Sequence, residues 1–254
     1  MVAGMYPIIA LWAHMRARST AFLRMMLERG DTFVIHEPLV TLADHGATTI
    51  PDGRGGERTV KSERELFAGL RELAVMRPVF FKDTVEHRYS YLFDHSEDIS
   101  DIVHTFILRD PRATINSVFN MKTNIVSPQI GYEHLWEIFV LSRTLSHRPP
   151  VIVHADQLIR NPEQVVEEYC RKVGLPFIPE ALFWLPGKQP VWEKTQRWHE
   201  DVSQSSGFQA FDNRYAVTVD NNRLLTGFYR YHSMFYGKFL EQEARESRAG
   251  HCNG

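Results

Sequence analysis

The chain has 254 residues, of which 43% are hydrophobic and 24% charged, values typical of a single globular domain with a substantial core. A formal net charge of −2 argues against bulk attraction to nucleic acid, and the longest apolar runs are shorter than a membrane span. Two cysteines, Cys170 and Cys252, are too few for a disulfide framework and lack metal-ligand spacing, which excludes the disulfide-rich secreted class.

The N-terminus leads almost directly into an apolar segment, without a basic stretch followed by a signal core and cleavage site. We therefore expect a cytoplasmic protein. We expect neither a membrane nor a nucleic acid as its partner, and the sequence leaves the oligomeric state open.

Apolar runs alternate along the chain with amphipathic segments that carry helix start and stop signals. The predicted strands are 7–12, 32–36, 79–82, 102–108 and 151–154. The predicted helices are 19–28, 62–75, 111–122, 132–146, 162–173 and 221–243. This order predicts an α/β fold in three layers, with a mainly parallel central sheet and helices on both faces.

Other segments do not follow this alternation. Residues 41–61 are polar and contain four glycines, which predicts a mobile loop. We expect an irregular lid over a cleft at 180–211, with plain packing of its aromatic residues as an equal alternative. That segment contains Trp184, Trp192, Trp198, His199 and Phe208. We expect one domain over 1–243 and a disordered tail over 244–254.

The first predicted strand leads into a short polar loop and then a helix. The connecting run is Met15-Arg16-Ala17-Arg18-Ser19-Thr20, with its two hydroxyl residues at the start of the helix. A strand, loop and helix in this order form a phosphate site, because backbone N–H groups and the positive end of the helix dipole receive an anion. The Walker pattern G-x-x-x-x-G-K-[ST] is absent and the loop contains no glycine. The run therefore predicts an anion site of a different kind.

A second anion site is predicted where the strand 102–108 ends on Arg109. The chain turns through Asp110 and Pro111 into a helix that carries Ser117, and proline suits the first helical turn because its missing N–H would be unpaired there. Arg109 and Ser117 can converge at the C-terminal edge of the sheet, where open α/β sheets bind ligands. A guanidinium, a hydroxyl and a helix N-terminus favour a dianionic group such as phosphate. Alone, this segment also fits an ordinary turn with surface arginines.

In this order the two segments resemble the nucleotide-binding motifs of the sulfotransferases that use 3′-phosphoadenosine 5′-phosphosulfate (PAPS). The first run resembles their 5′-phosphosulfate loop, P-[KR]-S-G-[ST]-T, with Met15 in place of proline and Arg18 in place of glycine. The segment from Arg109 to Ser117 matches R-D-P-R-x-x-x-x-S, which in the family holds the 3′-phosphate.

Weaker likenesses extend the resemblance to residues 6 to about 177. Residues 152–162 resemble the family segment R-Y-E-D-L-x-x-D-P, although Ala155 stands where tyrosine is frequent. Residues 174–176 resemble the end of F-L-G-[LI]-P. In cytosolic members an R-K-G segment completes the 3′-phosphate site. We find no clear counterpart of that segment after residue 177.

The resemblance implies a P-loop-like sulfotransferase fold that binds PAPS as sulfuryl donor, releases 3′-phosphoadenosine 5′-phosphate (PAP) and needs no metal. Arg16 is expected to stabilise charge on the leaving 5′-phosphate. Lys82 matches the lysine of the family's K-T-H segment and is expected to reach the same bridging oxygen. The donor-binding residues that the resemblance implies are Arg16, Ala17, Arg18, Ser19, Thr20, Arg109 and Ser117.

The general base has two main candidates. Glu37 follows a predicted strand at the place where tyrosylprotein sulfotransferases have a catalytic glutamate. His87 lies near the family's histidine, whose own position holds Thr84. His36 and Asp83 are further options. A histidine titrates near neutral pH without adjustment, whereas a carboxylate must be buried to become basic enough, and the sequence leaves the choice open.

We expect an enzyme that moves the sulfuryl group of PAPS to a hydroxyl, less readily an amine, of a small soluble acceptor. A phosphoryl-transfer enzyme of related fold would need a Walker lysine, which is absent, and an acidic magnesium ligand at a strand end. Asp110 fits that ligand poorly because the following proline indicates a turn. The remaining alternative is a non-catalytic nucleotide-binding protein that kept the anion loops and lost the base.

Overall fold

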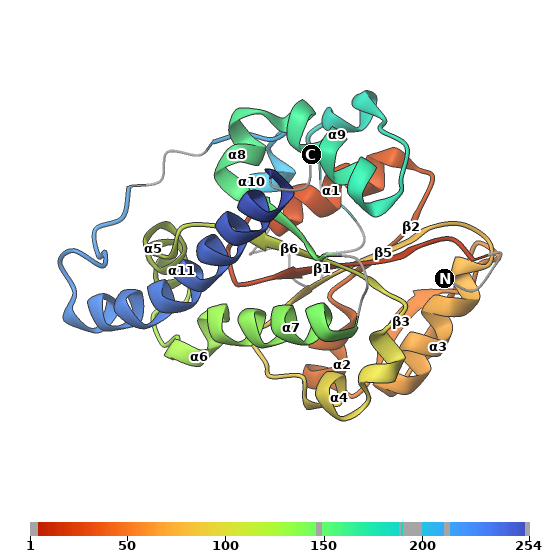
Figure 1. The fold of residues 1–254 in the computed structure, drawn as a ribbon, viewed down its shortest axis with the longest axis horizontal. Helices are drawn as coiled ribbons and strands as arrows, with labels where there is room; N and C mark the ends of the chain where they lie inside the picture. Colours follow the sequence, from red (N-terminus) through yellow and green to blue (C-terminus); the bar gives the residue numbers. More distant parts are fainter. Residues whose placement is uncertain (1–4, 146–148, 188, 190–199, 211–213, 252–254) are drawn as a thin grey trace.

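A computed structural model describes residues 5–145, 149–187, 189, 200–210 and 214–251 of the chain. A five-stranded parallel sheet forms its centre, in the order β2-β5-β1-β6-β7 (Figure 1). The strands are β1 Ile8–Ala13, β2 Phe33–His36, β5 Val79–Thr84, β6 Val103–Leu108 and β7 Val151–His154. The predicted α/β class and parallel sheet are confirmed.

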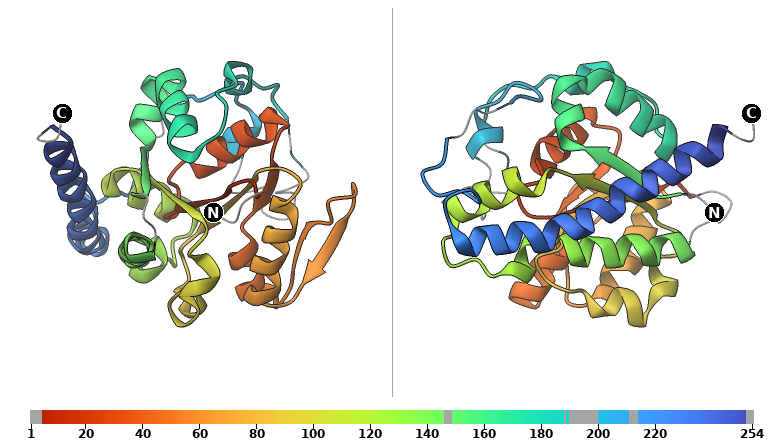
Figure 2. Two further views of the ribbon diagram at one scale, coloured as in Figure 1. Left: turned by 45° about the vertical axis from the view of Figure 1, so that its right-hand side comes forward. Right: turned by 60° about the vertical axis from the view of Figure 1, so that its left-hand side comes forward.

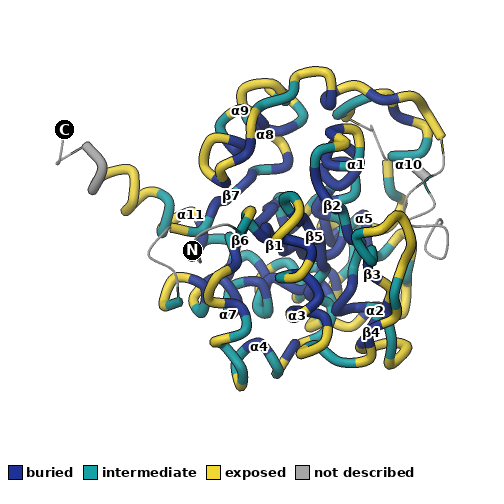
Figure 3. The backbone as a smooth tube through the Cα atoms, turned by 90° about the vertical axis from the view of Figure 1, so that its right-hand side faces the viewer, coloured by how far each residue is buried: buried dark blue, intermediate teal, exposed yellow. Residues whose placement is uncertain are grey.

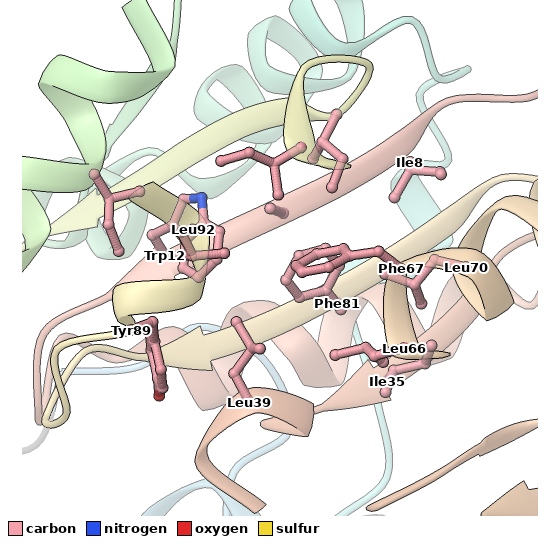
Figure 4. Packing of buried hydrophobic residues seen from close by; sticks show 14 of the residues in the cluster. Ile8, Trp12, Ile35, Leu39, Leu66, Phe67, Leu70, Phe81, Tyr89 and Leu92 are labelled. Carbon is pink, nitrogen blue, oxygen red and sulfur yellow. The ribbon is translucent and has the colours of Figure 1, made fainter. Parts of the chain in front are cut away.

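Helices cover both faces of this sheet, because successive side chains of each strand point to opposite sides. In β1 the even-numbered residues join one apolar cluster and the odd-numbered residues join another. The cluster that contains Trp12 and Phe81, whose rings meet edge to face at 5.6 Å, is shown in Figure 4. It is covered by α2 Pro38–His45, α3 Glu63–Ala74 and α7 Tyr132–Leu145, and the opposite cluster by α1 Ser19–Arg29 and α9 Pro162–Val173.

The C-terminal helix α11, Arg223–His251, lies along α5, Pro111–Met121, and along α7 (Figure 2). Its apolar residues join a third buried cluster with residues of α5, α7 and the short helix α6, Ser127–Ile130. Figure 3 shows the strands buried at the centre and exposed residues on the outer turns of the helices. The other described helices are α4 Ser90–Asp94, α8 Ala155–Arg160 and α10 Glu200–Ser203, with short 3-10 turns at Ser96–Ile99 and Pro179–Leu182. Among the described helices, none combines the length and the apolar character that crossing a membrane requires.

The predicted mobile loop at 41–61 is wrong. The segment completes α2 and then forms an antiparallel hairpin of β3, Thr48–Pro51, and β4, Glu57–Val60. Ile50 is buried in the core, and the Asp52 carboxylate accepts from two N–H groups of the turn. The glycines therefore mark a turn between two short strands.

Residues 244–251 of the predicted disordered tail lie in α11, which continues to His251. Pairs one helical turn apart support this part of the helix, namely Glu241 with Arg245 and Gln242 with Glu246. Glu246 also pairs with Arg143 of α7 at 3.8 Å. The last three residues of the predicted tail, 252–254, lie outside the described residues.

Candidate active site

The C-terminal ends of β1, β5 and β6 meet at one edge of the sheet. Ala13, the last residue of β1, is in register with Thr84 of β5 and Ile107 of β6. The loop after β1 and Arg109 after β6 therefore adjoin here, at the edge where open α/β sheets bind ligands. Because β2 lies beside β5, Glu37 joins the same edge.

Backbone strain is concentrated at this edge. Arg16, Arg18 and Glu37 have φ values of 55°, 69° and 47°, and they are all the non-glycine residues with positive φ in the described part of the chain. Such conformations cost on the order of 1–3 kcal/mol each and gather at functional sites. The conformation of Arg18 also explains why the resembling loops have glycine there, since glycine adopts positive φ without steric cost.

The loop delivers the N-terminus of α1 to this edge. Arg18 is the N-cap residue of α1 but makes no side-chain capping hydrogen bond, and the first turn contains no acidic residue. Ala17 and Ser19 are buried, whereas Arg16 and Thr20 are partly exposed. The positive end of the helix dipole and two guanidinium groups therefore favour an anion at this point.

Arg16 connects the two predicted anion sites. Its Nε donates to Ser117 Oγ at 3.0 Å, and its carbonyl oxygen accepts from Arg109 Nη1 at 3.1 Å. Arg109 Nε is buried without a hydrogen-bond partner among the described residues. Because an unsatisfied buried donor costs about 1–3 kcal/mol, Arg109 is suited to an anionic acceptor at this position.

Positive charge accumulates around Arg109. Burial lowers the pKa of Arg109, and the like charges of Arg18 and Arg16 lower it further. Tyr215 acts in the opposite direction, which places it within electrostatic range of the guanidinium. The sequence interpretation missed Tyr215, because it lies beyond the recognised motifs.

Lys82 and Glu37 form an ion pair on the β5 and β2 side of the edge. Lys82 Nζ contacts Glu37 Oε1, and the two side chains are 2% and 14% exposed. The Thr84 hydroxyl donates to the same carboxylate oxygen at 3.4 Å. The strand order brings the two residues together. Because β2 lies beside β5 with His36 in register with Lys82, Glu37, the next residue, lies close to Lys82. It provides a buried cation and a proton acceptor at one point of the site.

The other predicted bases occupy different surroundings. His87 Nε2 lies 2.9 Å from Asp44 Oδ1, and burial lowers the pKa of His36 to about 4. The Asp83 carboxylate is wholly buried and accepts from the N–H groups of Leu39 and Val40 at 2.7 and 3.1 Å. Burial raises the pKa of Asp83 well above its usual value. The Glu37 side chain, in contrast, forms an ion pair with Lys82.

His87 belongs to a separate group at the surface. Ligand atoms of Asp44, Glu86 and His87 lie within 4.8 Å of one another, a spacing that a metal ion could use. The expectation that the protein needs no metal stays a prediction.

The described parts of 180–211 pack beside α1. Trp184 is buried, donates from Nε1 to Ser205 Oγ at 3.1 Å and meets the Phe208 ring edge to face at 5.4 Å. Trp184 therefore packs in the core. Trp192, Trp198 and His199 lie outside the described residues, and the lid stays a prediction.

Comparisons with known proteins show which family model and which relatives the chain resembles. A family model described as "Sulfotransferase domain" matches residues 7–236. The chain is 25% identical over 216 residues to "Branched-chain-amino-acid aminotransferase-like protein 1" of Arabidopsis thaliana, covering 80% of this chain and 37% of that protein. The chain is 24% identical to "Branched-chain-amino-acid aminotransferase-like protein 2" of the same organism, covering 36% of that protein. The chain therefore spans little more than a third of the length of these two relatives.

Two solved structures share the fold. The sulfotransferase domain of the Synechococcus PCC 7002 olefin synthase superposes with a TM-score of 0.56 at 17% identity, covering 89% of this chain and 95% of that chain. The sulfotransferase domain from the curacin biosynthetic pathway gives 0.52 at 13% identity, with 80% and 100% covered.

Proposed function

The chain belongs to the sulfotransferase domain family, and we propose that it transfers the sulfuryl group of PAPS to a hydroxyl of a small acceptor. The observation that carries this proposal is the junction at Arg16, which joins the helix N-terminus of α1 to the Arg109 and Ser117 pair. Two anion sites so linked suit a nucleotide with phosphates at both its 5′ and 3′ positions.

The 3′-phosphate is assigned to Arg109 and Ser117. The unpartnered Arg109 Nε provides a donor that a phosphate oxygen would satisfy. The 5′ end is assigned to the loop 15–20, where backbone N–H groups and two arginines meet an anion. Charge-assisted hydrogen bonds of this kind contribute about 1.5–3 kcal/mol each.

When bound, PAPS supplies an already activated sulfuryl group. The acceptor oxygen forms a bond to sulfur as the bond from sulfur to the 5′-phosphate oxygen breaks. Glu37 takes the acceptor proton, and Lys82 and Arg16 stabilise the negative charge that develops on the leaving oxygen. The Lys82 and Glu37 contact supports this division, because it places base and cation side by side.

The other candidates are less suited to this step. His87 is paired with Asp44, and both Asp83 oxygens hold the N-terminal N–H groups of α2. His36 has its pKa lowered to about 4 and is a weak base near neutral pH. We do not propose the aminotransferase activity in the names of the Arabidopsis relatives, since the chain spans little more than a third of them.

Calorimetry with PAP and AMP tests the nucleotide assignment. Arg109→Ala should weaken PAP binding by about 2–4 kcal/mol and change AMP binding little. Arg88→Ala, which removes a surface arginine paired with Glu137, is the matched control and should affect neither ligand. Equal losses for PAP and AMP in Arg109→Ala would contradict the assignment.

Two further outcomes identify the alternatives. Loss of PAP binding on addition of a chelator would favour a metal-dependent phosphoryl-transfer enzyme. Tight PAP binding with no sulfation of any phenol or alcohol in an acceptor screen would favour a binding protein without turnover.

A further inference from the structure

The backbone of Arg109 is held on both sides by two buried aromatic side chains. Its N–H donates to His14 Nε2 at 3.0 Å, and its carbonyl oxygen accepts from the Tyr132 hydroxyl at 2.5 Å. His14 belongs to the segment just after β1, and Tyr132 is the first residue of α7. Three segments that are distant in sequence therefore meet at one residue.

The His14 ring has a fixed orientation and protonation state. It stacks on the Tyr132 ring with centroids 4.1 Å apart and planes inclined by 20°. Its Nδ1 lies 2.9 Å from the Met15 carbonyl oxygen, which can only accept, so Nδ1 carries the proton and Nε2 accepts. Burial lowers the pKa of His14 to about 3, so the ring stays neutral near neutral pH.

The contacts of His14 and Tyr132 hold Arg109 beside other arginines that carry the same charge. His14 lies two residues before Arg16, whose carbonyl oxygen accepts from the Arg109 guanidinium, while the like charges of Arg16, Arg18 and Arg109 repel one another. The backbone contacts at Arg109 oppose that repulsion between the loop 15–20 and the end of β6. His14 and Tyr132 hold those two segments together without adding charge.

We propose that His14 and Tyr132, here called the Arg109 bridge, are positioning residues that set the spacing between the two phosphate sites. The bridge thereby couples binding of the 5′- and 3′-phosphates of one nucleotide. This inference rests on the proposed function, since it requires that the two anion sites receive one bisphosphate. A ligand with a single phosphate occupies one site and does not depend on the spacing.

Calorimetry with PAP, 5′-AMP and 3′-AMP tests the coupling. Tyr132→Phe keeps the ring stack and removes the hydroxyl, which contacts the Arg109 carbonyl oxygen and lies 3.1 Å from Thr114 Oγ1. It should weaken PAP binding about tenfold while changing the Kd of each monophosphate by less than about twofold. Tyr169→Phe removes another buried hydroxyl, which lies 3.3 Å from Thr105 Oγ1 in the apolar cluster on the α1 side, and should change none of the three affinities.

A pair of His14 variants provides an independent measurement. His14→Gln retains a side-chain acceptor and should keep PAP affinity within about threefold of the wild type, whereas His14→Leu should lose about tenfold. A thermal melt of each variant establishes that it is folded before titration.

The outcomes separate this inference from the proposed function. If the wild-type protein binds PAP no better than 5′-AMP, the proposed function fails and the bridge fails with it. If the wild type prefers PAP and Tyr132→Phe retains that preference, the bridge alone is wrong. Equal weakening of all three ligands by Tyr132→Phe would also overturn it, because it would indicate a general structural role.

Discussion

At the residue scale, Arg18 holds a conformation that glycine adopts more easily. Replacing Arg18 with glycine should remove a left-handed strain and a like charge, and so raise the free energy of unfolding by about 0.5–1 kcal/mol. It should also weaken PAP binding several-fold, because a cation leaves the 5′-phosphate loop. Urea unfolding and calorimetry on the same variant measure both effects.

Gly30→Ala is a matched control for this prediction. Gly30 has a φ of +70°, close to that of Arg18, and no atom lies within 4 Å of the position of an added Cβ. Its substitution therefore isolates the backbone cost and should destabilise the protein by about 1 kcal/mol. If Arg18→Gly also destabilised the protein, the positive φ of Arg18 would not be a source of strain.

Lys82 should matter more to the rate than to binding. If its ammonium stabilises the leaving oxygen, its contribution grows as charge develops, so Lys82→Met should lower kcat far more than it weakens PAP affinity. Methionine keeps most of the volume of this buried side chain, whose residue is 1% exposed. Equal effects on kcat and Kd would assign Lys82 to ground-state binding.

The general base is identified by comparing two conservative variants. Glu37→Gln should lower the rate by about 10²-fold or more, because the amide cannot take the acceptor proton. His87→Asn should leave the rate nearly unchanged, since His87 pairs with Asp44 at the surface. The reverse result would move the base to His87.

At the scale of elements, the hairpin β3–β4 should contribute to stability. Ile50 is 1% exposed and packs in the core cluster with residues of α3, so Ile50→Ala should destabilise the protein by about 2–4 kcal/mol. Thr49→Ala, on the exposed face of the same strand, should change stability little. Denaturant unfolding measures both, and a negligible effect of Ile50→Ala would favour the mobile loop predicted from the sequence.

The sequence predicts the long elements well because their periodicity is strong. The five sheet strands are found close to their expected bounds, as are the helices α1, α3, α5, α7 and α9, whereas α2 and α8 were not predicted. The hairpin was missed because each strand has four residues, too few for an alternating pattern to exceed the glycine signal.

The site was only partly predictable for a related reason. The motifs at Arg16 and Arg109 lie at strand ends, so their convergence follows from a parallel sheet. The contact of Lys82 with Glu37 depends on β2 lying beside β5, which local sequence does not specify. His14 and Tyr132 carry no motif, and their roles follow only from the contacts they make in three dimensions.

At the scale of the whole molecule, buried histidines should make stability depend on pH. Burial lowers the pKa of His14 to about 3 and that of His36, His104 and His232 to about 4. The unfolded chain takes up protons near an ordinary histidine pKa of about 6.5, whereas the folded protein does not. These histidines therefore stabilise the fold fully above about pH 6.5, and this contribution is lost as the pH falls toward 4.

His104 allows this prediction to be tested away from the site. Its Nδ1 accepts from Trp12 Nε1 at 3.0 Å, which requires the neutral ring, and asparagine can present an oxygen near the same position. Between about pH 6 and 5, His104→Asn should reduce the slope of unfolding free energy against pH by about 1.4 kcal/mol per pH unit, because one proton fewer is taken up on unfolding.

Asp83→Asn should change the slope in the opposite sense, because a raised pKa makes the folded protein bind a proton more readily than the unfolded chain. Urea unfolding across this range measures both slopes, and an unchanged slope in His104→Asn would show that His104 does not stay neutral in the folded protein.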